Sequence, residues 1–280
     1  MGFLLASINI YKDKIREMKQ PDNWGWKARI GMFIVGVEAV PEAEWWAMLP
    51  PGVSLHIARV TASTPWAKWS SNGEEVEFQN DLARGATQFA AMHLSAVLIG
   101  HTSSSIIGGK GWDAAVVKRL SKSGPDGRVA TTNGLDCQAA LRICDVKRPF
   151  LIFPAWFNDR TIKEGCHYFS DRGFAPAGQM RFNPGQDWQG VPPNKLYAQG
   201  MGFDQDIDSL YRQIRTGCPP EADGILIAGT GFRCISILDA LEKVLQRPVI
   251  SANQASLWHC LRLSGLQDRV DGYGSLLSKK

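Results

Sequence analysis

The regular alternation of short apolar runs with helix-like segments is the feature that most constrains what this chain can fold into. Aliphatic and β-branched residues dominate the runs, which is typical of parallel strands buried on both faces. The runs are Ala28–Val35, Val53–Val60, Ala96–Gly100, Arg128–Thr131, Pro149–Phe153, Gly224–Ala228 and Pro248–Ser251. The helix-like segments are Glu42–Leu49, Glu77–Ser95, Trp112–Ser121, Leu135–Cys144, Asn158–Arg172, Asp204–Arg215, Phe232–Leu245 and Gln254–Leu263. This order predicts an α/β fold of two Rossmann-like lobes, each a mostly parallel sheet flanked by helices, with the active site in the cleft between them.

The pattern also predicts how the chain divides. We expect a peripheral N-terminal segment over residues 1–25 and a C-terminal lobe over residues 126–253. The N-terminal lobe would combine residues 26–125 with residues 254–280. The segment Pro176–Gln199 is rich in Pro, Gly and Gln, and it is the longest stretch without a clear pattern. A surface excursion and a lid over the cleft are both compatible with it.

Composition excludes several classes of function. A net charge of +4 with scattered basic residues over 280 residues gives little support to binding of nucleic acid or a membrane surface. The six cysteines form no C-x-x-C pair, so neither a zinc site nor a disulfide framework is expected, and the thiols suit a reducing cytoplasm. No apolar run approaches the roughly 20 residues needed to span a bilayer. We therefore expect a cytoplasmic protein that binds no metal.

The stretch Ala96–Trp112 carries the strongest chemical signal. Its apolar strand stops at Gly100, and His101 and the hydroxyl run Thr102–Ser105 follow. Turns of this kind, at the carboxyl ends of strands, form ligand sites in open α/β sheets. The imidazole could move a proton near neutral pH, while the hydroxyl and amide groups could bind an anion. The alternative is that the hydroxyls only cap the next helix and that His101 is an ordinary surface residue.

Three other loops follow predicted strands and should converge on the same cleft. Glu38 lies in an otherwise apolar loop, where burial would raise its pKa and suit it to proton transfer. An acid that simply favours the start of a helix is the alternative. Trp156 could form an aromatic wall or belong to the core. The turn Gly229-Thr230-Gly231 could offer amide donors to an anion, although it matches neither a dinucleotide fingerprint nor a P-loop.

Short motifs spread over most of the chain resemble those of one family. They are Arg29-Ile-Gly31, Glu42-Ala-Glu44, the segment Leu49–Arg59, Thr102-Ser103, Gly111-Trp112-Asp113, Ala139-Ala-Leu141, Phe169, Gly173-Phe174, Phe232-Arg233, Leu241-Glu242, the segment Arg247–Trp258 and the segment Leu261–Gly265. On these residues the chain resembles the aspartate/glutamate racemase superfamily, and within it the branch of maleate cis-trans isomerase and arylmalonate decarboxylase. The resemblance implies two pseudosymmetric lobes around one site, with neither metal nor organic cofactor. It is also compatible with a homo-oligomer.

The chain departs from this family at the positions of its two catalytic cysteines. By register, His101 replaces the first cysteine and Gly229 replaces the second. Cys234 follows a little later, and whether it reaches the cleft is open. Covalent addition to the substrate needs a thiolate, which His and Gly do not supply. Glu38 stands where the maleate isomerase branch has a carboxylate-binding asparagine, so it would repel a small dicarboxylate such as maleate.

These departures favour a cofactor-independent, decarboxylase-like lyase that works through an enolate or carbanion. Its substrate would be an aromatic or otherwise bulky carboxylic acid, and its acid–base catalysis would use no thiol. His101 would donate or relay the proton, and Glu38 would act as base or orient His101. The predicted substrate- and oxyanion-binding residues are Thr102, Ser103, Trp156, Gly229, Thr230, Gly231 and Asn253. One alternative is an isomerase or epimerase that uses the same two residues; the other is a non-catalytic family member that binds a small molecule.

Overall fold

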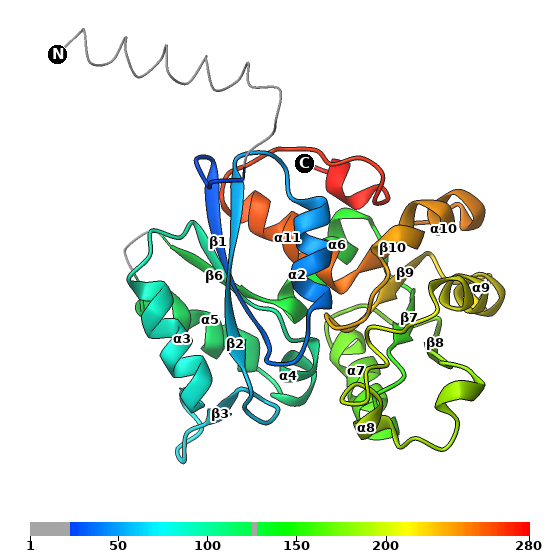
Figure 1. The fold of residues 1–280 in the computed structure, drawn as a ribbon, viewed down its shortest axis with the longest axis horizontal. Coiled ribbons are helices and arrows are strands. Elements are labelled where there is room, and N and C mark those ends of the chain that lie inside the picture. Colours follow the sequence, from blue (N-terminus) through cyan, green and yellow to red (C-terminus); the bar gives the residue numbers. More distant parts are fainter. Residues whose placement is uncertain (1–22, 125–127) are drawn as a thin grey trace, which may run out of the picture.

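Two parallel sheets lie side by side in the computed structural model, which describes residues 23–124 and 128–280 (Figure 1). The predicted peripheral segment, residues 1–25, falls almost entirely outside the described residues. The strands of the first sheet, in the order β2-β1-β5-β6, are β2 (Val53–Val60), β1 (Ala28–Val35), β5 (Ala96–Ile99) and β6 (Val129–Thr132). Those of the second, in the order β8-β7-β9-β10, are β8 (Gly178–Arg181), β7 (Pro149–Phe153), β9 (Gly224–Ile227) and β10 (Val249–Ser251). The predicted α/β fold is confirmed.

The two sheets share one topology. In each, the first strand along the chain pairs with the second on one side and with the third on the other, and the fourth lies beyond the third. All of these pairings are parallel, so the loops at the carboxyl ends of each sheet emerge at one edge. The predicted pseudosymmetry is therefore visible in the strand order. It makes the loop after β5 the counterpart of the loop after β9.

Helices cover both sheets and fill the space between them (Figure 1). They are α2 (Val40–Met48), α3 (Asn80–Ala90), α4 (Thr102–Ile107), α5 (Trp112–Lys122), α6 (Asn133–Ile143), α7 (Asp159–Ser170), α8 (Pro193–Leu196), α9 (Ile207–Gly217), α10 (Leu238–Leu245) and α11 (Ala252–Leu263), with single 3-10 turns η1 (Gln186–Trp188), η2 (Ile235–Ile237) and η3 (Leu276–Ser278). The counterparts α6 and α11, which follow the last strand of each sheet, pack against each other. Each is capped by a hydroxyl, because Thr132 accepts from the amide of Leu135 and Ser251 accepts from the amide of Gln254.

Several elements differ from the sequence-based expectation. A short hairpin, β3 (Ala67–Trp69) with β4 (Val76–Phe78), includes the first residues of the expected helix Glu77–Ser95. Strand β8 lies inside the segment expected to be irregular; its residues are partly or largely exposed at the sheet edge, so they lack the apolar pattern of a buried strand. The pairing of β6 with β5 attaches that strand to the first sheet, while the exact lobe boundaries stay a prediction.

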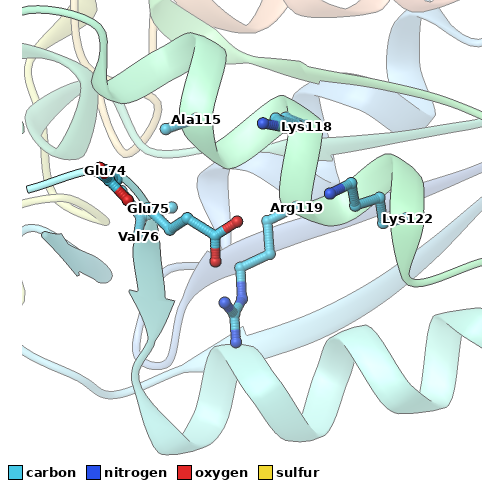
Figure 2. A pocket seen from close by; sticks show the side chains of 7 residues that line it. All are labelled: Glu74, Glu75, Val76, Ala115, Lys118, Arg119 and Lys122. Atoms are coloured by element: carbon cyan, nitrogen blue, oxygen red, sulfur yellow. The ribbon is translucent and has the colours of Figure 1, made fainter. Parts of the chain in front are cut away.

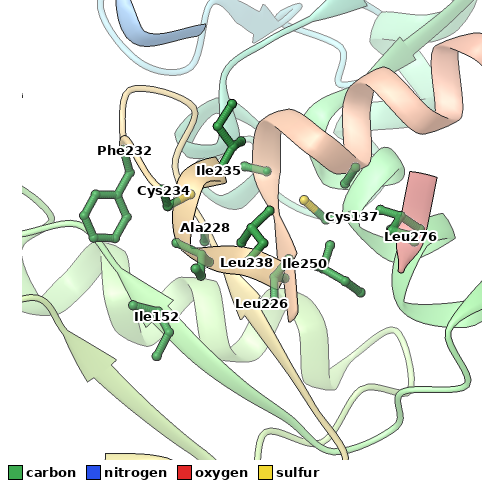
Figure 3. Close-up of a cluster of buried hydrophobic side chains, with 14 of the residues drawn as sticks. Cys137, Ile152, Leu226, Ala228, Phe232, Cys234, Ile235, Leu238, Ile250 and Leu276 are labelled. Atoms are coloured by element: carbon green, nitrogen blue, oxygen red, sulfur yellow. The ribbon is translucent and has the colours of Figure 1, made fainter. Parts of the chain in front are cut away.

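The largest buried cluster spans both lobes, from β1, β2 and β5 of the first sheet through α6 and α11 to β7, β9 and β10 of the second. Figure 3 shows part of it, where Cys234 lies among aliphatic and aromatic side chains that include Ala228, Phe232 and Leu238. All six cysteines are free thiols. In the part of the chain that the structure describes, no helix is long and apolar enough to cross a membrane.

A buried carboxylate joins the lobes. Glu44, on α2 of the first lobe, accepts hydrogen bonds from the amides of Cys234 (2.7 Å) and Ile235 (3.0 Å) with Oε1. Its Oε2 accepts from Asn253 Nδ2 at 2.7 Å. Burial raises the pKa of Glu44, and these three donors oppose that shift by favouring the ionised form. The carboxylate thus fixes α2 against the turn after β9 and the start of α11.

We expect Glu44→Ala to lower the free energy of unfolding by about 3–5 kcal/mol, because three buried donors would lose their acceptor. Urea denaturation monitored by tryptophan fluorescence measures the change. The exposed Glu221 provides a matched control, since Glu221→Ala should stay within about 0.5 kcal/mol of the parent. A loss below about 1 kcal/mol for Glu44→Ala would show that the interlobe contact does not depend on this carboxylate.

Candidate active site

The loops at the carboxyl ends of both sheets enclose a cavity of about 710 Å³ between the lobes. The loops after β1, β5, β7 and β9 contribute, as the sequence analysis expected, and the segments after β2 and β8 contribute as well. The cavity is lined by Val35, Val37, Glu38, Thr64, His101, Thr102, Ser103, Ile107, Trp156, Phe157, Asn158, Arg160, Thr161, Asn194, Tyr197, Ala198, Gly229, Thr230 and Gly231. No cysteine is among these lining residues.

His101 is held by two neighbours from the first lobe. Its ring stacks on Trp66, with centroids 4.2 Å apart and planes inclined by 18°. Its Nδ1 lies 2.8 Å from Ser104 Oγ, which also accepts from the Trp66 amide at 3.1 Å. This arrangement lets the Ser104 hydroxyl donate to Nδ1, and in that tautomer the ring proton is on Nε2. Burial lowers the pKa of His101 to about 3, which keeps the imidazole neutral throughout the physiological range.

Glu38 is buried without compensation, at 7% exposure. Its Oε2 has no hydrogen-bond partner among the described residues. Burial raises the pKa of Glu38 to about 8, so the carboxyl group is mostly protonated at neutral pH. Arg59 holds the loop that carries Glu38. It donates hydrogen bonds to the carbonyl oxygens of Gly36 (3.1 Å) and Glu38 (2.9 Å), and it forms an ion pair with Glu42.

The hydroxyls expected to bind an oxyanion are mostly engaged elsewhere. Thr102 Oγ1 donates to Asn133 Oδ1 at 2.5 Å, and Thr230 Oγ1 donates to the carbonyl oxygen of Gly100 at 3.0 Å. Ser103 keeps a hydroxyl at the cavity wall. The main-chain amides of Thr102 and Ser103 open helix α4, where the first amides have no intrahelical acceptor. The structure therefore supplies anion donors here mainly from the backbone, together with the Ser103 hydroxyl.

Asn253 is not part of the cavity wall, although we predicted it to bind substrate. Its Nδ2 donates to Glu44 Oε2 and to the carbonyl oxygen of Thr230, at 2.9 Å for the latter. The side chain is buried beneath the turn that carries Thr230 and Gly231. Asn253 therefore holds the turn in place from the side that faces away from the cavity. In this structure it has a structural role and does not line the substrate cavity as predicted.

Neither of the residues near the expected second thiol position provides a reactive sulfur. Gly229 has φ +102°, a conformation that L side chains rarely adopt, and a Cβ there would lie 3.1 Å from Pro154 Cγ. Cys234 is 1% exposed within the apolar cluster of Figure 3, and it does not line the cavity. Burial raises the pKa of its thiol well above the usual value. Thiolate chemistry is therefore not available from Cys234 in this geometry.

The aromatic wall predicted at Trp156 is present, and it is larger than expected. Trp156 makes edge contacts with Tyr197 (centroids 4.8 Å apart) and with Phe232 (5.8 Å). Sequence reasoning missed Tyr197, because it lies in the irregular segment after β8. It also missed Arg160, an exposed residue in the first turn of α7 at the cavity rim. The position of Arg160, just after the loop that carries Trp156, was a usable signal.

His101 and Glu38 share the cavity without forming a direct hydrogen bond to each other. They enter from different loops of the first lobe, and no hydrogen bond or ion pair joins them in the described structure. Ser104, rather than Glu38, orients the imidazole. The two groups are thus placed to act on a bound molecule separately.

A second hollow lies outside the cleft, between α5 and the β3–β4 hairpin (Figure 2). Charged side chains of both signs line it, among them Glu75, Lys118, Arg119 and Lys122. At about 140 Å³ it is smaller than the interlobe cavity, and it contains no buried titratable group. The interlobe cavity is therefore the candidate active site.

Solved structures of two enzymes share this fold. Unliganded arylmalonate decarboxylase matches with a TM-score of 0.67 and 21% identity, over 89% of this chain and 98% of that one. The maleate cis-trans isomerase of Nocardia farcinica, in a variant with a covalently bound succinylcysteine intermediate, matches with a TM-score of 0.71 and 18% identity. A maleate isomerase variant of Pseudomonas putida with maleate matches with a TM-score of 0.72 and 17% identity. The two isomerase matches each cover 90% of this chain and 98% of the other.

A sequence-level match points to the same branch. The family model of arylmalonate decarboxylase matches residues 200–277, which run from the end of the Tyr197 segment through β9, β10 and α11. No curated protein matches the chain. The resemblance to the arylmalonate decarboxylase and maleate isomerase branch is thereby confirmed.

We expect the buried Glu38 carboxyl to make stability fall as pH rises. The native state keeps the proton up to about pH 8, whereas the unfolded chain releases it from about pH 4.5. Between these values the unfolded state binds fewer protons, so the free energy of unfolding decreases by up to about 1.4 kcal/mol per pH unit from this group. Glu38→Gln lacks this dependence and should gain stability relative to the parent as pH rises.

Urea titrations of the parent and of Glu38→Gln at about pH 5 and pH 9 measure this difference. Other titrating groups cancel because both proteins carry them, and the exposed Glu221→Gln substitution controls for loss of a surface charge. A stability difference between parent and Glu38→Gln that is the same at both pH values would mean that the native Glu38 carboxyl has an ordinary pKa.

Proposed function

We propose that this protein is a cofactor-independent lyase that decarboxylates an aromatic or bulky carboxylic acid by thiol-free acid–base chemistry. The observation that carries the proposal is one cavity holding a neutral imidazole and a protonated, unpartnered carboxyl group, with no thiol among its lining residues. Decarboxylation requires a proton donor at carbon and stabilisation of an oxyanion, and the site contains both. The shared fold with arylmalonate decarboxylase supports the same reaction class.

Each end of the cavity suits a different part of such a substrate. The guanidinium of Arg160 at the rim, together with the Ser103 hydroxyl and the first amides of α4, can bind a carboxylate. Trp156 and Tyr197 provide an apolar wall for an aryl or alkyl group. A carboxylate pressed against that wall loses hydration, which favours its departure as carbon dioxide.

The reaction balances without a cofactor. The bond between the α-carbon and the departing carboxylate breaks, carbon dioxide leaves, and the electron pair stays on the α-carbon as an enediolate shared with the remaining carboxyl group. The Nε2–H group of His101 donates a hydrogen bond to that oxyanion and keeps its proton. The Ser103 hydroxyl lies beside it. Glu38 transfers its proton to the α-carbon, and the Glu38 carboxylate then takes up a proton from bulk solvent, so each turnover consumes one proton and releases one carbon dioxide.

This assignment exchanges the roles that the sequence suggested. The sequence predicted that His101 would donate or relay the proton and that Glu38 would act as base or orient His101. With a pKa near 3, His101 carries no transferable excess proton at neutral pH, whereas Glu38 with a pKa near 8 does. An anionic substrate beside Glu38 would raise the pKa of Glu38 further and keep the proton in place until the chemical step.

Covalent isomerisation is less well supported. The Nocardia farcinica isomerase carries a succinylcysteine intermediate, so its chemistry passes through a cysteine. No cysteine lines the cavity of the present protein. An isomerase that uses only proton transfer and a non-catalytic binding protein stay alternatives, and the experiment below separates them from a lyase.

We expect the parent protein to convert at least one member of a panel of aryl and alkyl malonates to the monoacid in deuterated water, with one deuterium placed on the α-carbon. Glu38→Gln removes the proton donor and should lower turnover by roughly 10²–10⁴-fold. His101→Gln removes the aligned oxyanion donor and should lower turnover by roughly 10²–10³-fold. Proton NMR follows both substrate loss and deuterium uptake.

The exposed His93→Ala and Glu221→Gln substitutions are matched controls, and each should retain parental turnover. Double-bond or configurational change without loss of carbon dioxide, tested by adding unsaturated and 2-aryl acids to the panel, would identify an isomerase. Binding of panel members without any conversion would favour the non-catalytic alternative. Full activity in Glu38→Gln would remove Glu38 from the chemistry.

The ratio kcat/KM should fall at alkaline pH. Only the protonated form of Glu38 can donate, so kcat/KM should be level below the pKa of about 8 and then decrease about tenfold per pH unit. Stopped assays across about pH 6 to pH 10 provide the profile. A value of kcat/KM that instead rises through pH 8 would assign Glu38 the role of base.

A further inference from the structure

Two buried polar atoms of the cavity are left without a partner. Glu38 Oε2 and Tyr197 Oη have no hydrogen bond within residues 23–124 and 128–280, and both side chains line the cavity. Most other polar groups near them are satisfied, including His101 Nδ1 and the hydroxyls of Thr102 and Thr230. An unpaired buried polar atom costs about 1–3 kcal/mol, so a molecule that pairs with these atoms recovers that free energy on binding.

These two unpaired groups lie together. A Cβ at Gly231 would lie 2.5 Å from Glu38 Oε1 and 3.1 Å from Tyr197 Cε2, so the carboxyl group and the phenol ring edge cover the same side of that glycine. Burial raises the pKa of Tyr197, and a charge on Glu38 raises it further, as expected for close neighbours, whereas the charge of Arg59 opposes the shift. Position 231 must be glycine for the pair to fit.

The phenol of Tyr197 is held rigidly although it comes from a segment with little regular structure. Leu196, at the end of α8, is 4% exposed and anchors the segment in the core. The chain then turns back, with the amide of Met201 donating to the carbonyl oxygen of Leu196 at 3.1 Å. Gly202 packs directly against the Tyr197 ring, since a Cβ at position 202 would lie 2.4 Å from Tyr197 Cε2. With Trp156 on another side, Tyr197 Oη is fixed in place before any ligand binds.

The chemistry around this pair selects an uncharged partner. Among the described lining residues, Arg160 is the only Lys or Arg, and it is exposed at the rim. Glu38 and Tyr197 are both neutral at physiological pH and have no cation of the cavity wall between them and a ligand. The charge of Arg59 reaches Tyr197, but Arg59 is outside the cavity wall and is paired with Glu42. A hydroxyl or ether oxygen beside the pair therefore meets a smaller desolvation cost than a second carboxylate would.

We propose that Tyr197 determines specificity by donating a hydrogen bond to an uncharged oxygen substituent, a hydroxyl or ether, on the substrate carbon that Glu38 protonates. The identity of that carbon rests on the proposed function. The position of the oxygen follows from geometry: Tyr197 lies beside Glu38, so an atom in contact with the Glu38 carboxyl group has its substituents within reach of Tyr197. The substrates of this enzyme are thus malonic acids that carry a 2-hydroxyl or 2-ether group beside a bulky or aromatic group, and their products are 2-oxygenated monoacids.

Binding of three stable acids to the full-length protein, measured by isothermal titration calorimetry, tests the proposal without requiring turnover. Mandelate carries the 2-hydroxyl group, phenylacetate lacks it, and 4-hydroxyphenylacetate places the same group on the ring. The parent should bind mandelate about 10- to 100-fold more tightly than either of the others, which corresponds to one well-formed hydrogen bond. Tyr197→Phe keeps the ring contacts and should bind all three acids with similar affinity, with phenylacetate unchanged.

Several outcomes would overturn the proposal. These are equal affinity of the parent for mandelate and phenylacetate, equal gain from the ring hydroxyl, no binding of any of the three acids, or a loss in Tyr197→Phe that is the same for all three. The result is separate from that of the turnover assay. Decarboxylation with no preference for 2-oxygenated acids refutes only the role of Tyr197, and a preference lost in Tyr197→Phe without decarboxylation refutes only the proposed function.

Discussion

The geometry of the site depends on one buried carboxylate that belongs to neither the substrate nor the chemistry. Glu44 reaches from the first lobe into the second and binds the side chain of Asn253. Asn253 also donates a hydrogen bond to the carbonyl oxygen of Thr230. The Thr230 hydroxyl donates in turn to the carbonyl oxygen of Gly100 in the first lobe. The residue after Gly100 is His101. This closed series of hydrogen bonds sets the distance between the loops that form the cavity, so the lobes present their functional groups as one surface.

Two buried acids, Glu44 and Glu38, show how hydrogen-bond partners separate structural from chemical roles. Burial raises the pKa of both, but Glu44 has three donors that favour its charged form, whereas Glu38 has none. His101 is likewise desolvated, with a hydroxyl rather than an acid beside it. The interior of the cavity is therefore nearly uncharged at neutral pH, with its cation at the rim. Such a site favours a substrate whose charge is at one end and whose reacting carbon lies in an apolar, water-poor interior.

The sequence predicts the framework better than it predicts the contacts within it. Buried parallel strands such as β5 and β7 are visible because both of their faces are apolar, and the loops after them follow from sheet geometry. The edge strand β8 lacks that pattern and was missed. The same cause explains why Asn253 was predicted to contact the substrate and why Tyr197 was overlooked. Whether a polar side chain faces a cavity or a buried carboxylate is decided by residues far away in the sequence, and no local pattern encodes it.

The glycine turn after β9 and the position of Glu38 form a single structural arrangement. With glycine at 229, the turn adopts φ +102°, and two residues later the missing side chain of Gly231 leaves the space that the Glu38 carboxyl group occupies. A larger residue at 231 would displace Glu38, so the acid and the glycine turn depend on each other. The pseudosymmetry of the fold is therefore broken at the site itself, where the first lobe supplies both His101 and Glu38. Under the proposed mechanism the α-carbon receives its proton from one direction, which favours a single enantiomer of the product over a racemic mixture.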